Sequence, residues 1–144
     1  MTDDLYQEVI LDHGKRPRNF GKLENASVKA EGFNPLCGDR LTLELKLDNN
    51  IVQDAKFTGA GCAISVASAS LMTETLKGKT RAEVQQIFER FHQLLTTDSA
   101  VPDMGKLAVF SGVREFPARV KCATLAWHTL QAALENPEQK VSTE

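Results

Sequence analysis

Three cysteines are the residues of this chain best suited to chemistry. Cys37, Cys62 and Cys122 stand 25 and 60 residues apart, so no two of them form a CxxC pair. An odd number of cysteines fits poorly with a framework of disulfides. Widely spaced cysteines in a cytosolic protein are more typical of metal binding or thiol chemistry. We therefore expect a site that the fold assembles from distant parts of the chain.

Cys37 lies in a predicted turn, where Gly38 relieves steric limits and Asp39 follows two residues on. This spacing would let a thiolate and a carboxylate reach the same ion. The alternative is an ordinary turn in which Asp39 makes an Asx-type hydrogen bond to the backbone.

Cys62 and Cys122 have neighbours that favour a thiolate. Cys62 follows Gly59-Ala60-Gly61 and begins a predicted helix, whose N-terminus lowers the pKa of a thiol. Cys122 lies beside Arg119 and Lys121, whose positive charges act in the same direction. The alternatives are a small buried residue at a helix start and a core cysteine whose charged neighbours face water.

The three thiolates and the carboxylate of Asp39 together make a four-coordinate donor set. Sulfur-rich tetrahedral coordination suits zinc, and it also suits iron in a cluster. This donor set carries more negative charge than one Zn²⁺ ion neutralises. The positive charges of Arg119 and Lys121 could offset the excess. The site would be structural if closed, and reactive if one ligand can exchange.

The three histidines fit this site less well. His13 ends the first predicted helix, where a cation is favourable. His92 is expected on the surface of a helix, and His128 lies about 240° around the last helix from Cys122. The spacing supports no Cys/His/Asp triad, and the chain has no nucleotide-binding motif.

The length and composition indicate one globular domain. The chain has 144 residues, 42% of them hydrophobic and 25% charged. We expect a single domain over residues 1–136 and a polar C-terminal tail over 137–144. The net charge of −2 argues against a nucleic-acid partner. The absence of a long apolar segment or signal peptide indicates a cytoplasmic protein without a membrane partner.

The hydrophobic periodicity predicts an α+β fold, with a small antiparallel sheet of about three strands covered on one face by helices. A capping box, Thr80 with Glu83, opens one of these helices. Residues 96–112 read as a loop with one helical turn near Met104. The other expected elements are a helix over 3–13, strands over 26–33, 41–48 and 51–58, a helix after Gly61 and a helix over 117–134.

The three cysteine motifs resemble those of the IscU/NifU N-terminal family of iron–sulfur cluster assembly proteins. They are Cys37-Gly38-Asp39, Gly59-Ala60-Gly61-Cys62-Ala63-Ile64-Ser65 and Arg119-Val120-Lys121-Cys122. Within that family the chain is similar to the SufU-type branch. Scaffold-type members have histidine where this chain has Lys121, and their interval between the second and third cysteines is shorter.

The resemblance implies a zinc site formed by Cys37, Asp39, Cys62 and Cys122. It also implies a PLP-dependent cysteine desulfurase of the SufS type as partner, from which the chain accepts persulfide sulfur and passes it to the SufBCD scaffold. Cys37 is the expected acceptor, because a turn moves more easily than a helix. Arg119 is a candidate for stabilising the site or the transferred sulfur; a surface cation is the alternative.

Two other functions stay open at this point. The chain could be a scaffold for a nascent [2Fe–2S] cluster, in which case it would hold iron or a transient cluster instead of zinc. It could also be a binding module whose zinc only holds the fold. The sequence leaves open whether the chain is itself an enzyme; if it is, the expected activity is that of a zinc-dependent sulfurtransferase.

Overall fold

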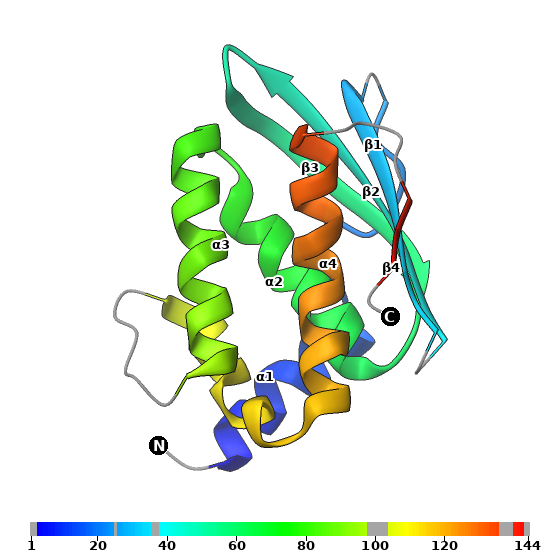
Figure 1. Cartoon of the computed structure of the whole chain (residues 1–144). Helices are drawn as coiled ribbons and strands as arrows, with labels where there is room; N and C mark the ends of the chain where they lie inside the picture. Colours follow the sequence, from blue (N-terminus) through cyan, green and yellow to red (C-terminus); the bar gives the residue numbers. More distant parts are fainter. Residues whose placement is uncertain (1–2, 25, 36–37, 98–103, 136–139, 143–144) are drawn as a thin grey trace.

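The computed structural model describes residues 3–24, 26–35, 38–97, 104–135 and 140–142. Helices cover one face of a sheet (Figure 1), which confirms the predicted α+β class. The elements in chain order are α1 (Asp3–Lys15), β1 (Val28–Asn34), β2 (Asp39–Asp48), β3 (Ile51–Ala60), α2 (Ala63–Leu76), α3 (Arg81–Thr96), the 3₁₀ helix η1 (Gly105–Glu115), α4 (Pro117–Glu135) and β4 (Lys140–Ser142).

The sheet has the strand order β3-β2-β1-β4. β1 pairs with β2, and β2 with β3, in antiparallel register, as predicted. Asn49 and Asn50 join β2 to β3 with positive φ angles of 52° and 65°, the backbone of a tight type I′ turn. β4 adds a parallel edge strand beside β1. The sequence does not predict β4, because three residues are too short for an alternating pattern.

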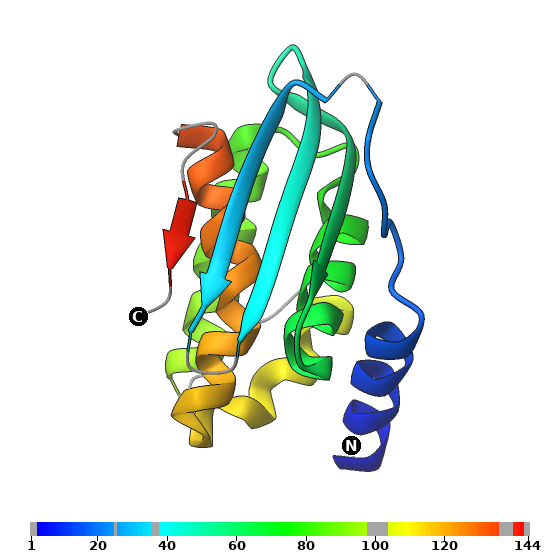
Figure 2. The same ribbon diagram turned by 90° about the vertical axis from the view of Figure 1, so that its right-hand side faces the viewer.

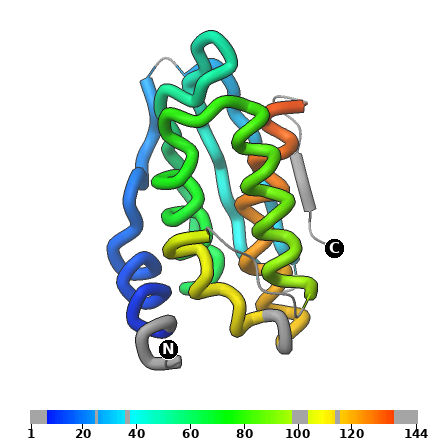
Figure 3. Tube along the Cα trace, turned by 90° about the vertical axis from the view of Figure 1, so that its left-hand side faces the viewer, coloured from blue at the N-terminus to red at the C-terminus, as the bar shows by residue number. Residues whose placement is uncertain are grey.

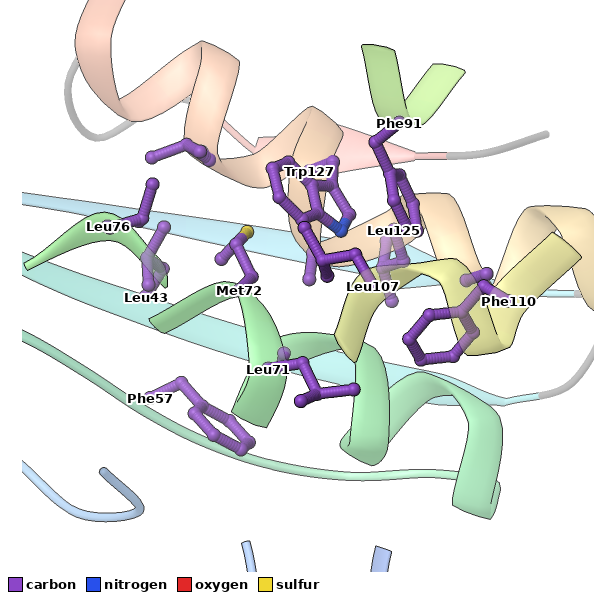
Figure 4. Packing of buried hydrophobic residues seen from close by; sticks show 14 of the residues in the cluster. Leu43, Phe57, Leu71, Met72, Leu76, Phe91, Leu107, Phe110, Leu125 and Trp127 are labelled. Atoms are coloured by element: carbon purple, nitrogen blue, oxygen red, sulfur yellow. The ribbon is translucent and has the colours of Figure 1, made fainter. Parts of the chain in front are cut away.

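The helices pack on the sheet in two layers. α4 lies against β1 and β2, and α2 lies against β3, while α3 and η1 pack outside them. The strand residues that face the helices are apolar, and Leu43, Leu45 and Phe57 are almost wholly buried. Between the helices, Trp127 stacks on Phe91 with ring centroids 4.6 Å apart (Figure 4). This core fixes α2 and α4 relative to the sheet.

η1 corrects the predicted loop over residues 96–112. Its buried residues Leu107, Phe110 and Val113 recur at every third position, which is the period of a 3₁₀ helix. A search for the α-helical period of 3.6 misses this pattern, and Gly105 and Gly112 read as loop residues. η1 is therefore part of the core.

α1 corrects the expectation for His13. The helix continues to Lys15, and the His13 side chain is buried, not a cation at an exposed helix end. Its Nδ1 lies 2.7 Å from Oγ of Ser70 in α2, and burial lowers its pKa. A Cβ at Gly14 would lie 3.1 Å from the Cβ of Ala63, so α1 closely approaches the start of α2. Figure 3 shows α1, η1 and the start of α2 at one end of the molecule.

None of the described helices has the length and apolar character needed to cross a bilayer.

Candidate metal centre

Three of the four predicted donors meet at one end of the sheet. Asp39 is the first residue of β2, Cys62 caps the N-terminus of α2, and Cys122 lies in the second turn of α4. Figure 2 shows these three element starts converging at the same end of the fold. The fourth predicted donor, Cys37, lies outside the described residues.

The donor atoms of Asp39, Cys62 and Cys122 all lie within 4.8 Å of one another. The Sγ of Cys62 is 4.0 Å from Oδ2 of Asp39. Asp39 is fully buried and Cys122 is 2% exposed, whereas Cys62 is intermediate. Asp39 and Cys122 thus form the buried side of the cluster, and Cys62 forms its more accessible side.

Cys62 occupies the N-cap position that the sequence predicts for it. Its backbone is extended, with φ −70° and ψ 164°, and its Sγ accepts a hydrogen bond from the backbone N–H of Ser65 at 3.4 Å. A sulfur in this position receives both a hydrogen bond and the positive end of the helix dipole.

Asp39 is tied directly to the start of α2. Its Oδ1 accepts a hydrogen bond from the backbone N–H of Cys62 at 2.8 Å. A Cβ at Gly61 would clash with this carboxylate, lying 2.9 Å from Cγ and 3.0 Å from Cβ of Asp39. The absence of a side chain at Gly61 therefore allows the Asp39 carboxylate to approach the start of α2 closely.

Asn34 is a residue of the site that the sequence motifs do not single out. It is fully buried, and its Nδ2 donates to Oδ2 of Asp39 at 3.2 Å and to Sγ of Cys122 at 3.5 Å. The hairpin register pairs Asn34 with Asp39. Asn34 lies on the same buried face of β1 as Ala30 and Gly32, and this face packs against α4. A polar residue at an inward-facing strand position, paired with a candidate ligand, is the signal that could have found it.

The two cations near Cys122 lie on the exposed side of α4. Arg119 and Lys121 are both exposed, and the Arg119 guanidinium lies 4.5 Å from the ring centroid of Phe116. Cys122 itself is buried, with its Sγ among the donor atoms. Of the two interpretations that the sequence allows for Arg119 and Lys121, the structure matches the one in which their charges face water.

No histidine joins the donor cluster in the part of the chain that the structure describes. His92 is exposed, as expected. His128 packs edge-on against Phe88, with ring centroids 5.8 Å apart, and burial lowers its pKa.

The donor set fits a zinc ion in chemistry and in spacing. Two thiolate sulfurs bound tetrahedrally to one zinc lie about 3.8 Å apart, and a sulfur and a carboxylate oxygen about 3.5 Å apart. The 4.0 Å separation of Cys62 and Asp39 therefore needs only a small adjustment. Three donors leave room for a fourth ligand.

Comparisons with known proteins identify the family of the chain. The NifU-like N-terminal domain family matches residues 5–123. The chain is 48% identical to the zinc-dependent sulfurtransferase SufU of Bacillus subtilis, over 94% of this chain and 93% of that protein. It is 43% identical to the iron–sulfur cluster assembly scaffold protein IscU of Thermotoga maritima, over 91% of this chain and 93% of that protein.

A solved structure has the same fold. The crystal structure of FiSufU from Fervidobacterium islandicum, described as an iron–sulfur cluster assembly scaffold protein for the SUF system, superposes with a TM-score of 0.82. The two sequences are 38% identical, and the match covers 93% of this chain and 99% of that one. By sequence and by fold, the chain belongs to the NifU-like N-terminal domain family of iron–sulfur cluster assembly proteins.

Proposed function

We propose that this protein is a zinc-dependent sulfurtransferase of iron–sulfur cluster assembly. It accepts persulfide sulfur from a SufS-type cysteine desulfurase and passes it to the SufBCD scaffold. The observation that carries the proposal is the grouping of the Asp39, Cys62 and Cys122 donor atoms. The 48% identity to a zinc-dependent sulfurtransferase supports the same role.

Cys37, Asp39, Cys62 and Cys122 would hold the zinc. Cys37 precedes Asp39 by two residues, so chain connectivity keeps their Cα atoms within about 7.6 Å of each other. When bound, zinc keeps its cysteine ligands as thiolates. Because Asp39 and Cys122 are buried, their donor atoms would form the fixed side of the site.

Cys37 is the proposed sulfur acceptor. Its thiolate attacks the outer sulfur of the persulfide on the desulfurase, and the new bond joins that sulfur to Cys37. The sulfur–sulfur bond on the desulfurase breaks, and its cysteine leaves as a thiolate. Cys62 and Cys122 stay in place, because one caps α2 and the other is packed in α4.

Arg119 would assist from the rim of the site. Its exposed guanidinium, held against Phe116, is one helical turn before Cys122 and can approach the negatively charged sulfur during transfer. The transfer chemistry requires reduced thiols, which supports a cytoplasmic location.

The competing function is a scaffold for [2Fe–2S] assembly, which the name of the Thermotoga maritima relative supports. Lys121 favours sulfur transfer, because an ammonium group cannot replace the imidazole that scaffold-type members carry before the third cysteine. In the third function, zinc only holds the fold and the chain leaves the desulfurase unaffected.

Desulfurase turnover tests the proposal. Turnover of the cognate enzyme with cysteine is measured alone, with zinc-loaded protein, and with the Cys37→Ser variant loaded with zinc. We expect turnover to rise only with the parent protein. Stimulation by Cys37→Ser would show that Cys37 is not the acceptor, and an absence of stimulation by the parent would refute sulfur transfer. Iron with a brown colour in protein purified from cells would favour the scaffold function.

A further inference from the structure

Asn34 touches two of the three described donors with one amide group. Its Nδ2 reaches Asp39 from β2 and Cys122 from α4, at 3.2 Å and 3.5 Å. Asp39 is then held through both oxygens, since its Oδ1 accepts the backbone N–H of Cys62. The orientation of the carboxylate and the position of the Cys122 sulfur thus depend on the same side chain.

The orientation of this amide is informative. The opposite orientation would turn Oδ1 toward a carboxylate and a sulfur, which are acceptors when ionised. With Nδ2 facing them, Oδ1 is buried and has no hydrogen-bond partner among the described residues. A buried acceptor without a donor is unfavourable. The interactions of Nδ2 with Asp39 and Cys122 offset that cost.

We propose that Asn34 is a positioning residue for the metal centre. Its N–H groups hold the Asp39 carboxylate and the Cys122 sulfur in the arrangement that a metal ion requires. This inference rests on the metal site proposed above. Hydrogen bonds to metal ligands typically change metal affinity 10- to 100-fold, and Asn34 supplies such bonds to two ligands at once.

Zinc affinity of Asn34 variants tests this role. Asn34→Leu removes the amide, and Asn34→Asp keeps its shape but replaces the N–H donors with a carboxylate. Thr129→Val is the matched control. Thr129 is buried on α4, facing Gly32 of β1, and its hydroxyl bonds only the carbonyl of Leu125 among the described residues. Competition with a chelator should show a loss of about 10- to 100-fold for both Asn34 variants and a change within about twofold for Thr129→Val.

Cobalt substitution gives a second readout that packing alone would not move. A thiolate that loses a hydrogen bond holds its lone pairs at higher energy, so the sulfur-to-cobalt charge-transfer bands should shift to longer wavelength in Asn34→Leu. Thermal unfolding of the metal-free proteins should show only a small change in Asn34→Leu, because the variant removes the unpaired Oδ1 of Asn34 and also removes the donor to Oδ2 of Asp39, and these two effects oppose each other. The cobalt bands therefore distinguish a positioning residue from one that only packs.

The outcomes separate this inference from the proposed function. If the parent binds neither zinc nor cobalt, the metal site and the role of Asn34 both fail. If the parent binds and either Asn34 variant matches or exceeds its affinity, the role of Asn34 alone fails. If Asn34→Leu does not fold, Asn34→Asp decides, since it has the same shape and lacks the donors.

Discussion

Gly61→Ala should damage the site from outside the donor set. Gly61 has no positive φ angle, so alanine is allowed by the backbone at this position. The obstacle is the Asp39 carboxylate, whose Cγ and Cβ would lie 2.9 Å and 3.0 Å from the new methyl group. The carboxylate must move away, and its hydrogen bond from the N–H of Cys62 then lengthens or breaks.

The expected loss follows from these two effects. Overpacking costs about 1 to 3 kcal/mol, and loss of a hydrogen bond to a charged group about 1.5 to 3 kcal/mol. When the carboxylate moves away, it relieves the overpacking but loses the hydrogen bond. The two costs therefore do not add fully. We expect the free energy of unfolding to fall by about 2 to 4 kcal/mol. For a chain of this length, that lowers Tm by about 7 to 13 °C.

Gly112→Ala is the matched control. A Cβ at Gly112 meets no atom within 4 Å, and the residue is exposed in η1. Thermal unfolding of both metal-free variants, followed by zinc titration, makes the comparison. Gly61→Ala should lose stability and at least about tenfold in zinc affinity, and Gly112→Ala neither. Equal stability and equal zinc affinity in the two variants would refute the account of how Asp39 is placed.

Two further predictions concern the helices that support the site. His13 is neutral in the fold, because burial lowers its pKa, while the unfolded chain takes up a proton near pH 6.5. The free energy of unfolding should therefore fall as the pH drops below about 6.5. Urea unfolding at pH 7 and pH 5.5 should show a smaller pH dependence for His13→Gln than for the parent. Parallel pH profiles of the two proteins would contradict this prediction. Thr80→Ala removes the side-chain acceptor for the N–H of Glu83 and should cost about 1 kcal/mol, measured by the urea midpoint. Glu83→Gln, which keeps an acceptor for the N–H of Thr80, should cost less, and the reverse order would contradict the capping geometry.

Local patterns were sufficient to predict the parts of the fold with a strong short-range signal. The strands β2 and β3 and the Thr80–Glu83 capping box form as expected, and the alternating leucines of β2 and the Asn49-Asn50 turn are short-range signals of the same kind. The N-cap position of Cys62 was predictable for the same reason, because a helix start is set by its immediate neighbours.

The remaining features depend on contacts between distant segments. Asn34 is an ordinary turn-flanking residue in the sequence, and only the hairpin register and the packing of α4 give it two hydrogen-bonding partners. His13 reads as a helix-terminal cation until α2 covers it. η1 shows a period of three that glycines obscure. Such features require the tertiary structure, since no local preference encodes them.

The most direct test of the central claim is to locate the transferred sulfur. Zinc-loaded protein is mixed with the persulfide form of its cognate desulfurase, and after one turnover its thiols are blocked and its peptides are analysed by mass spectrometry. The account predicts zinc equimolar with the chain before transfer and one added sulfur atom on the peptide that carries Cys37, with Cys62 and Cys122 unmodified. Added sulfur on Cys62 or Cys122, or no transfer to the zinc-loaded chain, would contradict it.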